Sequence, residues 1–205
     1  MTSYLRHWIA ASLVIIALGQ STFADDDLRA PRVPPAIQVP AGNTPFLVGQ
    51  AVGTQNYVCL PSASGFSWTL FGPQATLFFT FKISNSEIQQ QITTHFLSAN
   101  PDENGMPRPT WQSSFDTSAV WGRSMASSMD SNFVAPGAIP WLLLQVVGTE
   151  RGPAGGDFLT QTTFIHRLNT SRGMAPSTGC SQSTNVGATA LVPYTADYFF
   201  YKAGR

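Results

Sequence analysis

The feature that most constrains the fold is a series of short apolar runs, separated by Gly, Pro, Asn or Ser every eight to twelve residues. The runs are rich in Val, Ile, Thr, Phe, Tyr and Trp, which suit the pleated surface of a β-sheet. Clear examples are FLVGQAV, TLFFTFKI, IPWLLLQVVG and DYFFYK. The pattern predicts an all-β protein: a single-domain antiparallel β-sandwich or barrel with long ordered loops.

The N-terminal part of the chain predicts export. Residues 1–24 have the features of a secretory signal peptide, because a weakly basic start precedes the apolar run WIAASLVIIALG and small residues flank a cleavage point. Residues 25–36, DDDLRAPRVPPA, are charged and proline-rich and predict a flexible leader. Residues 37–205 then form the all-β domain. We expect a secreted or periplasmic protein that has no membrane attachment after cleavage.

The charge balance limits the partners. The chain has eleven Lys and Arg against eleven Asp and Glu, and loss of Arg6 with the signal peptide would give a net charge of −1. A near-neutral chain without basic clusters argues against nucleic acid as a partner. We therefore expect a monomer whose partner is a small-molecule or polymer ligand.

The two cysteines, Cys59 and Cys180, predict a disulfide. An exported chain enters an oxidising compartment, where cysteines far apart in sequence usually pair. The alternative is a reactive thiol pair, which would more often show a C-x-x-C spacing.

One segment, TTHFLSANPDENGMPRPTW, holds the main candidates for chemistry. Strand alternation places His95 on the more polar face of its strand, toward solvent or a groove. There it could act as a general acid or base, because the pKa of histidine lies near neutrality. Candidate catalytic partners are Asp102, Glu103 and Asp116. The alternative is a surface histidine without catalytic function.

The turn that follows His95 has two interpretations. Asn100, Asp102 and Asn104 have the spacing of the first half of a calcium loop, but Trp111 stands where the last acidic ligand should be. The same residues are also common in turns. We predict no metal and no cofactor, with calcium as the alternative. We also predict that residues 98–110 form a solvent-exposed connection, whose shortening would cost less than about 1 kcal/mol.

The tryptophans suggest a binding face. Trp111 and Trp121 lie beside predicted turns or strand ends, where flat rings can stack on a ligand. We take these two residues as candidate ligand-binding side chains. The alternative is that they belong to the hydrophobic core.

Several stretches together resemble one family. They include FLVGQAVGTQNYVCLP, LFGPQATLF, TWQSSFDTSAVWG, FIHRLNTSRGMAPSTGC and LVPYTADYFFYK. In this order they resemble a family of exported bacterial and fungal proteins known as domain of unknown function 3455. The resemblance implies an exported single domain in which Cys59 pairs with Cys180. It implies no activity, substrate or catalytic residue.

Two functions follow as expectations. The first is a non-enzymatic extracytoplasmic module that binds its ligand through an aromatic-lined face. The alternative is a hydrolase or lyase that acts on extracellular polymers with His95 and nearby carboxylates. The sequence alone does not decide whether the protein is an enzyme.

Overall fold

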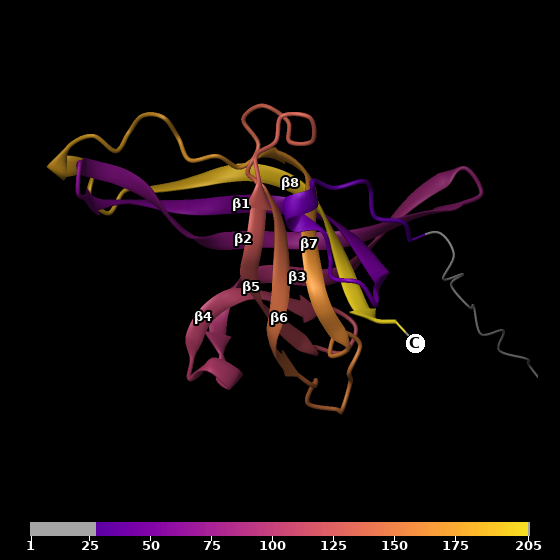
Figure 1. Cartoon of the computed structure of the whole chain (residues 1–205). Helices are drawn as coiled ribbons and strands as arrows, with labels where there is room; N and C mark the ends of the chain where they lie inside the picture. The colour runs from indigo at the N-terminus through magenta and orange to yellow at the C-terminus, as the bar shows by residue number, and fades with distance from the viewer. Residues whose placement is uncertain (1–27, 205) are drawn as a thin grey trace, which may run out of the picture.

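The computed structural model describes residues 28–204, which form a closed barrel of antiparallel strands (Figure 1). Each strand pairs with the next one in sequence, and the last strand closes the barrel against the first. The strands are β1 (Asn43–Ser62), β2 (Gly65–Ile83), β3 (Ser86–Asn100), β4 (Met106–Ser113), β5 (Ala119–Ser128), β6 (Trp141–Glu150), β7 (Thr162–Arg172) and β8 (Thr189–Ala203). The 3-10 turns are η1 (Pro35–Ile37), η2 (Pro101–Glu103) and η3 (Ser183–Asn185). The predicted all-β antiparallel fold is confirmed, in its barrel form.

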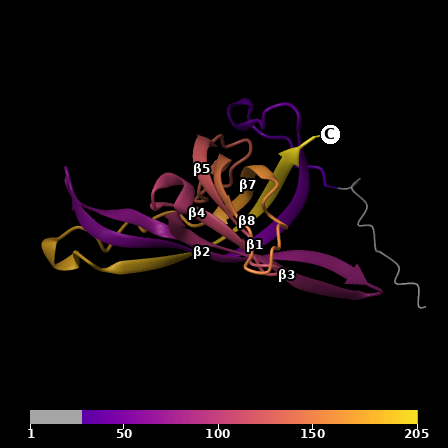
Figure 2. The ribbon, with the colours of Figure 1, turned by 90° about the horizontal axis from the view of Figure 1, so that it is seen from below.

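The longest strands project beyond the barrel. β1 and β2 have 20 and 19 residues, whereas β4 has 8. The surplus of β1 and β2, together with the start of β8, forms a ribbon on one side of the barrel, and the β2–β3 hairpin projects on the other side (Figures 1 and 2). A strand that is longer than its neighbour has no hydrogen-bonding partner along the extra length of that edge. We therefore expect an open surface at the junction between the ribbon and the barrel.

The predicted disulfide is present. Cys59 on β1 is joined to Cys180 in the loop between β7 and β8, and the two Cα atoms are 5.5 Å apart. A formed disulfide indicates an oxidising, extracytoplasmic environment. The loop is also held by Trp68, whose indole N–H donates a 2.8 Å hydrogen bond to the Thr178 carbonyl. The long ribbon is therefore closed at its far end.

The barrel interior is filled by large aromatic side chains from two strands. Trp111 projects from β4, and Tyr194, Tyr198 and Phe200 project from β8. Beside β8, the paired strands β1 and β2 carry small inward residues, among them Ala51 and Ala75. At Gly53 a side chain would collide with the neighbouring strand, because its Cα packs directly on Ala75. The small residues thus leave the volume that the rings occupy.

A second apolar cluster covers the outside of β6, β7 and β8. Its central residue, Ile37, is fully buried, and Ala30 and Val33 pack against the same cluster. We predicted a flexible leader over residues 25–36, and this prediction is wrong for residues 28–36. The apolar side chains between the prolines pack against the second cluster and hold the segment in place. Residues 25–27 and the predicted signal peptide lie outside the described residues. Within residues 28–204, no helix is long and apolar enough to cross a membrane.

Candidate functional site

The structure places His95 inside the barrel, which corrects our prediction that it faces solvent or a groove. β2 and β3 change register between Leu77 and Phe78, so that Ile92 is an extra residue on β3. An extra residue shifts the alternation of the strand, and every side chain beyond it changes face. Thr93 and His95 therefore point inward, and His95 is only 3% exposed.

The His95 ring is fixed by its neighbours. It stacks on Trp111 with ring centroids 4.1 Å apart and an interplanar angle of 9°, and it meets the edge of Tyr198 at 5.1 Å. The carbonyl of Thr110 accepts a 2.9 Å hydrogen bond from Nδ1, which must therefore carry the proton. Burial lowers the pKa of His95 to about 3, so the ring is neutral at physiological pH. It contributes to the core as a stacked, uncharged side chain.

The acidic residues nearest in sequence do not reach His95. Asp102 and Glu103 lie on η2, beyond the end of β3, and the five strand residues that follow His95 extend roughly 16 Å at about 3.3 Å each. Glu103 forms a two-point ion pair with Arg108, at 2.7 Å and 2.8 Å. The hydrogen bond from Arg108, followed by that from Asn100, lowers the pKa of Glu103 to about 2. Glu103 is thus engaged in holding the hairpin.

Asp116 is also held by hydrogen bonds within the protein. Its Oδ1 accepts hydrogen bonds from the Ser118 N–H at 3.1 Å and the Ser118 hydroxyl at 2.8 Å. Its Oδ2 accepts a 2.8 Å hydrogen bond from the Phe158 N–H. Burial alone would raise the pKa of Asp116, but these hydrogen bonds outweigh it and lower the pKa to about 2. Asp116 ties the β4–β5 turn to the segment before β7. The structure therefore does not assemble the predicted group of His95 with Asp102, Glu103 and Asp116.

The connection that we predicted over residues 98–110 is mostly strand. β3 continues to Asn100 and β4 begins at Met106, which leaves a short turn. Asn100 is fully buried: its Oδ1 accepts from the Asp102 N–H at 3.1 Å, and its Nδ2 donates to Glu103 at 2.9 Å and to the Val147 carbonyl at 3.2 Å. The prediction of an exposed connection is correct for residues 101–102 and 104–107 but not for Asn100, whose buried amide joins the hairpin to β6. We now expect a shortening that removes Asn100 to cost more than about 1 kcal/mol.

The same contacts bear on the calcium alternative. Asn100 directs its oxygen at the backbone of η2, and Asp102 accepts a 3.4 Å hydrogen bond from the Thr149 N–H. Asn104 ends the turn in the left-handed conformation, with φ of 54°. Among the described residues, no three His, Cys, Asp or Glu side chains are grouped to hold a metal ion. These side chains stabilise the turn through contacts within the protein.

We expect Asn100→Ala to lower the free energy of unfolding by about 1–3 kcal/mol, because it removes the three hydrogen bonds of a fully buried amide. Urea denaturation of the variant and of the wild type measures this difference. Met106→Ala is the control, since Met106 lies in the same hairpin and is 51% exposed. It should change stability by less than about 0.5 kcal/mol. If Asn100→Ala were as stable as the wild type, the hydrogen bonds of the Asn100 amide would not stabilise this turn.

The two tryptophans do not form an accessible face. Trp111 is fully buried inside the barrel, and Trp121 is 5% exposed on the outer side of β5. The indole N–H of Trp121 donates a 2.9 Å hydrogen bond to the Ser98 hydroxyl, so the β3–β4 hairpin covers it. Trp111 thus belongs to the hydrophobic core, which was the alternative interpretation, and Trp121 is buried beneath the β3–β4 hairpin.

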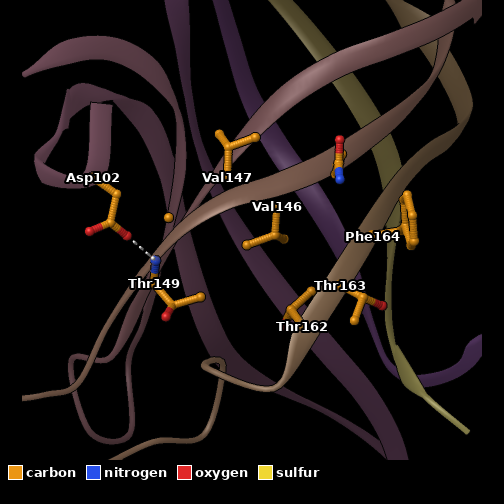
Figure 3. A pocket seen from close by; sticks show the side chains of 9 residues that line it. Asp102, Val146, Val147, Thr149, Thr162, Thr163 and Phe164 are labelled. Atoms are coloured by element: carbon orange, nitrogen blue, oxygen red, sulfur yellow. Dashed lines mark hydrogen bonds between the residues drawn. The ribbon is translucent and has the colours of Figure 1, made fainter. Parts of the chain in front are cut away.

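A first hollow lies where β6 and β7 separate. The two strands pair only between 142–145 and 164–167, and beyond them a hollow of about 550 Å³ opens between the strands, with Asp102 at its edge (Figure 3). Two of its three hydroxyls are already used: Thr162 donates to the Leu159 carbonyl at 2.6 Å, and Thr163 donates to Asn43 at 2.7 Å. No exposed aromatic ring lies beside the remaining polar groups, since Phe164, the one aromatic residue of its lining, is half-buried.

A second hollow, of about 670 Å³, lies on the outer face of β1, β2 and β3 at the junction with the ribbon. We call it the outer groove. β3 pairs with β2 only as far as Ala75, so beyond this point β2 is paired with β1 alone. Strand alternation turns the following side chains into the outer groove: Val52, Thr54, Asn56, Gln74, Thr76, Thr94 and Phe96. Phe71 lines the outer groove as well, although it does not follow the alternation. The outer groove also borders the backbone of His95, whose ring points into the barrel.

A bulge presents the most exposed aromatic ring of the outer groove. Asn56 pairs with Gly72 and Tyr57 pairs with Leu70, so that Phe71 is the extra residue on β2. Bulges re-aim side chains, and Phe71 is 70% exposed. The protein thus leaves a large apolar ring in water beside a hollow, which is what a ligand-contacting residue requires.

Sequence reasoning missed the outer groove, although one signal was present. Leu70 and Phe71 interrupt the alternation of their strand, and Gly72-Pro73 follows directly. Gly and Pro inside a strand indicate a bulge or an edge. The other side chains of the outer groove are Thr, Asn and Gln, which occur throughout this sequence and give no local signal.

Comparison with known proteins agrees with the motif resemblance. No curated protein and no solved structure matches the chain. Residues 40–202 match the family described as protein of unknown function (DUF3455), which covers nearly the whole barrel from before β1 to the end of β8. The chain belongs to the DUF3455 family.

Proposed function

We propose that the protein is a non-enzymatic extracytoplasmic binding module, secreted or periplasmic, that holds a small or polymeric ligand in the outer groove. The observation that carries this proposal is Phe71, an aromatic side chain that a bulge exposes by 70% beside a hollow of about 670 Å³. In this proposal Phe71 and Phe96 replace Trp111 and Trp121 as the aromatic side chains that contact the ligand.

The surroundings of the outer groove support binding more than chemistry. Its floor is the backbone of paired strands, which gives a rigid surface on which a ligand loses little binding energy to rearrangement. Its outward side chains include no carboxylate, amine or thiol that could act as an acid, base or nucleophile. The disulfide at the end of the ribbon fits a protein that works in an oxidising compartment.

We expect a chemically mixed library, containing neutral sugars, aromatic compounds and small carboxylates, to give compounds that raise the melting temperature of the wild type. Calorimetric titration of these compounds should show binding weakened at least tenfold, about 1.4 kcal/mol, in Phe71→Ser, because the exposed ring is lost. Met125→Ser is the control: Met125 is 55% exposed on β5, away from the outer groove. Compounds that bind Phe71→Ser as tightly as the wild type would contradict the proposal.

A further inference from the structure

The outer groove contains no charge. None of the residues that line it is Asp, Glu, Lys or Arg, and the single titratable residue among them, His95, directs its ring into the barrel. A charged ligand would leave water without gaining a counter-charge here, which is unfavourable beside apolar side chains. The outer groove therefore suits an uncharged ligand.

Hydrogen-bonding groups of the outer groove remain available. The Thr54 hydroxyl donates a 2.7 Å hydrogen bond to the side-chain oxygen Oδ1 of Asn56, which leaves the N–H groups of the Asn56 side-chain amide free to donate. The side chains of Gln74, Thr76 and Thr94 form no hydrogen bond with another side chain or backbone group between residues 28 and 204. Together these groups offer donors and acceptors to a ligand that carries hydroxyls.

Two flat rings complete the outer groove. Phe71 is largely exposed and Phe96 is half-buried, and both are aromatic surfaces without a polar atom. The outer groove extends over Val52–Asn56 along β1, about 13 Å, and over three adjacent strands, about 10 Å. These dimensions exceed those of one six-membered ring, so a polymer segment fits as well as a single unit.

We propose that the ligand of the outer groove is a neutral sugar, either free or as a residue of an uncharged polysaccharide. This inference rests on the proposed function, for which it names the ligand class. A sugar ring has an apolar C–H face, which stacks on an aromatic ring, and a hydroxyl edge, which exchanges hydrogen bonds with Thr, Asn and Gln. A purely apolar ligand would leave the four polar side chains unpaired, and an anionic ligand would find no cation.

Affinity electrophoresis in native gels tests the ligand class. The neutral probes are hydroxyethyl cellulose, arabinoxylan and galactomannan, and the charged probes are carboxymethyl cellulose and polygalacturonate. The two cellulose derivatives share a backbone and differ in charge. We expect at least one neutral polymer to retard the mature wild-type protein, and its charged counterparts to leave the mobility unchanged.

The variants separate stacking from hydrogen bonding. Phe71→Ser and Asn56→Ala should each weaken retardation at least tenfold, whereas Phe71→Trp should preserve it because the larger ring still stacks. Met125→Ser should behave as the wild type. Retardation by the charged polymers alone, by none of the polymers, or with equal strength in Phe71→Ser would overturn the inference. If library compounds other than sugars still bind in a Phe71-dependent manner, the proposed function stands and only the sugar assignment fails.

Discussion

Removal of the Cys59–Cys180 disulfide should lower the free energy of unfolding by several kcal/mol, the largest single change that we expect. The two cysteines are 121 residues apart. For a closed loop of that length the chain-entropy relation gives about 5 kcal/mol, and measured losses usually fall between about 2 and 5 kcal/mol. The disulfide also holds the loop before β8 to the ribbon, so its loss leaves the loop attached by hydrogen bonds alone.

Urea denaturation with and without reductant measures the effect. The double variant Cys59→Ser/Cys180→Ser is the matched control, because its stability should equal that of the reduced wild type and should not respond to reductant. Two backbone hydrogen bonds remain between Cys59 and the loop, to Ala188 at 2.9 Å and from Gly187 at 3.0 Å. A loss below about 1 kcal/mol would show that these contacts hold the loop without the cross-link.

The second large effect is a loss of stability in mild acid. Burial lowers the pKa of His95 to about 3 in the folded protein, against 6.5 in the unfolded chain. The unfolded chain therefore binds a proton between these values and the folded protein does not. The stabilisation is fully present above pH 6.5 and is lost as the pH falls toward 3. Between pH 7 and pH 5, His95 should account for about 2 kcal/mol.

His166 changes stability in the same direction. Its Nε2 donates a 2.6 Å hydrogen bond to the Ile37 carbonyl, and burial lowers its pKa. His95→Phe should therefore reduce the slope of stability against pH between 7 and 5 without abolishing it. The ring proton resonances of His95 should not titrate above pH 4 in the wild type. A slope that is unchanged in His95→Phe, or a His95 resonance that titrates near pH 6, would contradict its burial.

The fold class could be predicted from the sequence, because the spacing of the apolar runs and their β-branched and aromatic residues directly indicate β-strands. It was insufficient for His95, because one extra residue at Ile92 reverses the alternation that a reader would extend along β3. Nothing local in the residues around Ile92 indicates that shift, which depends on how β2 and β3 pair.

The burial of Asn100 was not predictable for a similar reason. Asn100 belongs to a sequence typical of an exposed turn, yet its amide contacts Val147 on a strand that follows 47 residues later. Residue propensities predict the backbone conformation of the turn. The contact between Asn100 and Val147 depends instead on how the sheet curves into a barrel. The outer groove depends on strand pairing in the same way, because its side chains come from three strands that only the assembled sheet places together.

Mapping a bound ligand by ¹H–¹⁵N nuclear magnetic resonance tests whether the ligand occupies the outer groove. The protein would be titrated with whichever library compound or neutral polysaccharide fragment binds best. We expect the backbone amides of Thr54, Thr76 and Thr94 to shift with the ligand, and the indole N–H resonances of Trp111 and Trp121 to stay unchanged. Shifts centred on the two indoles, or on the hollow between β6 and β7, with the outer groove unchanged, would contradict the proposal.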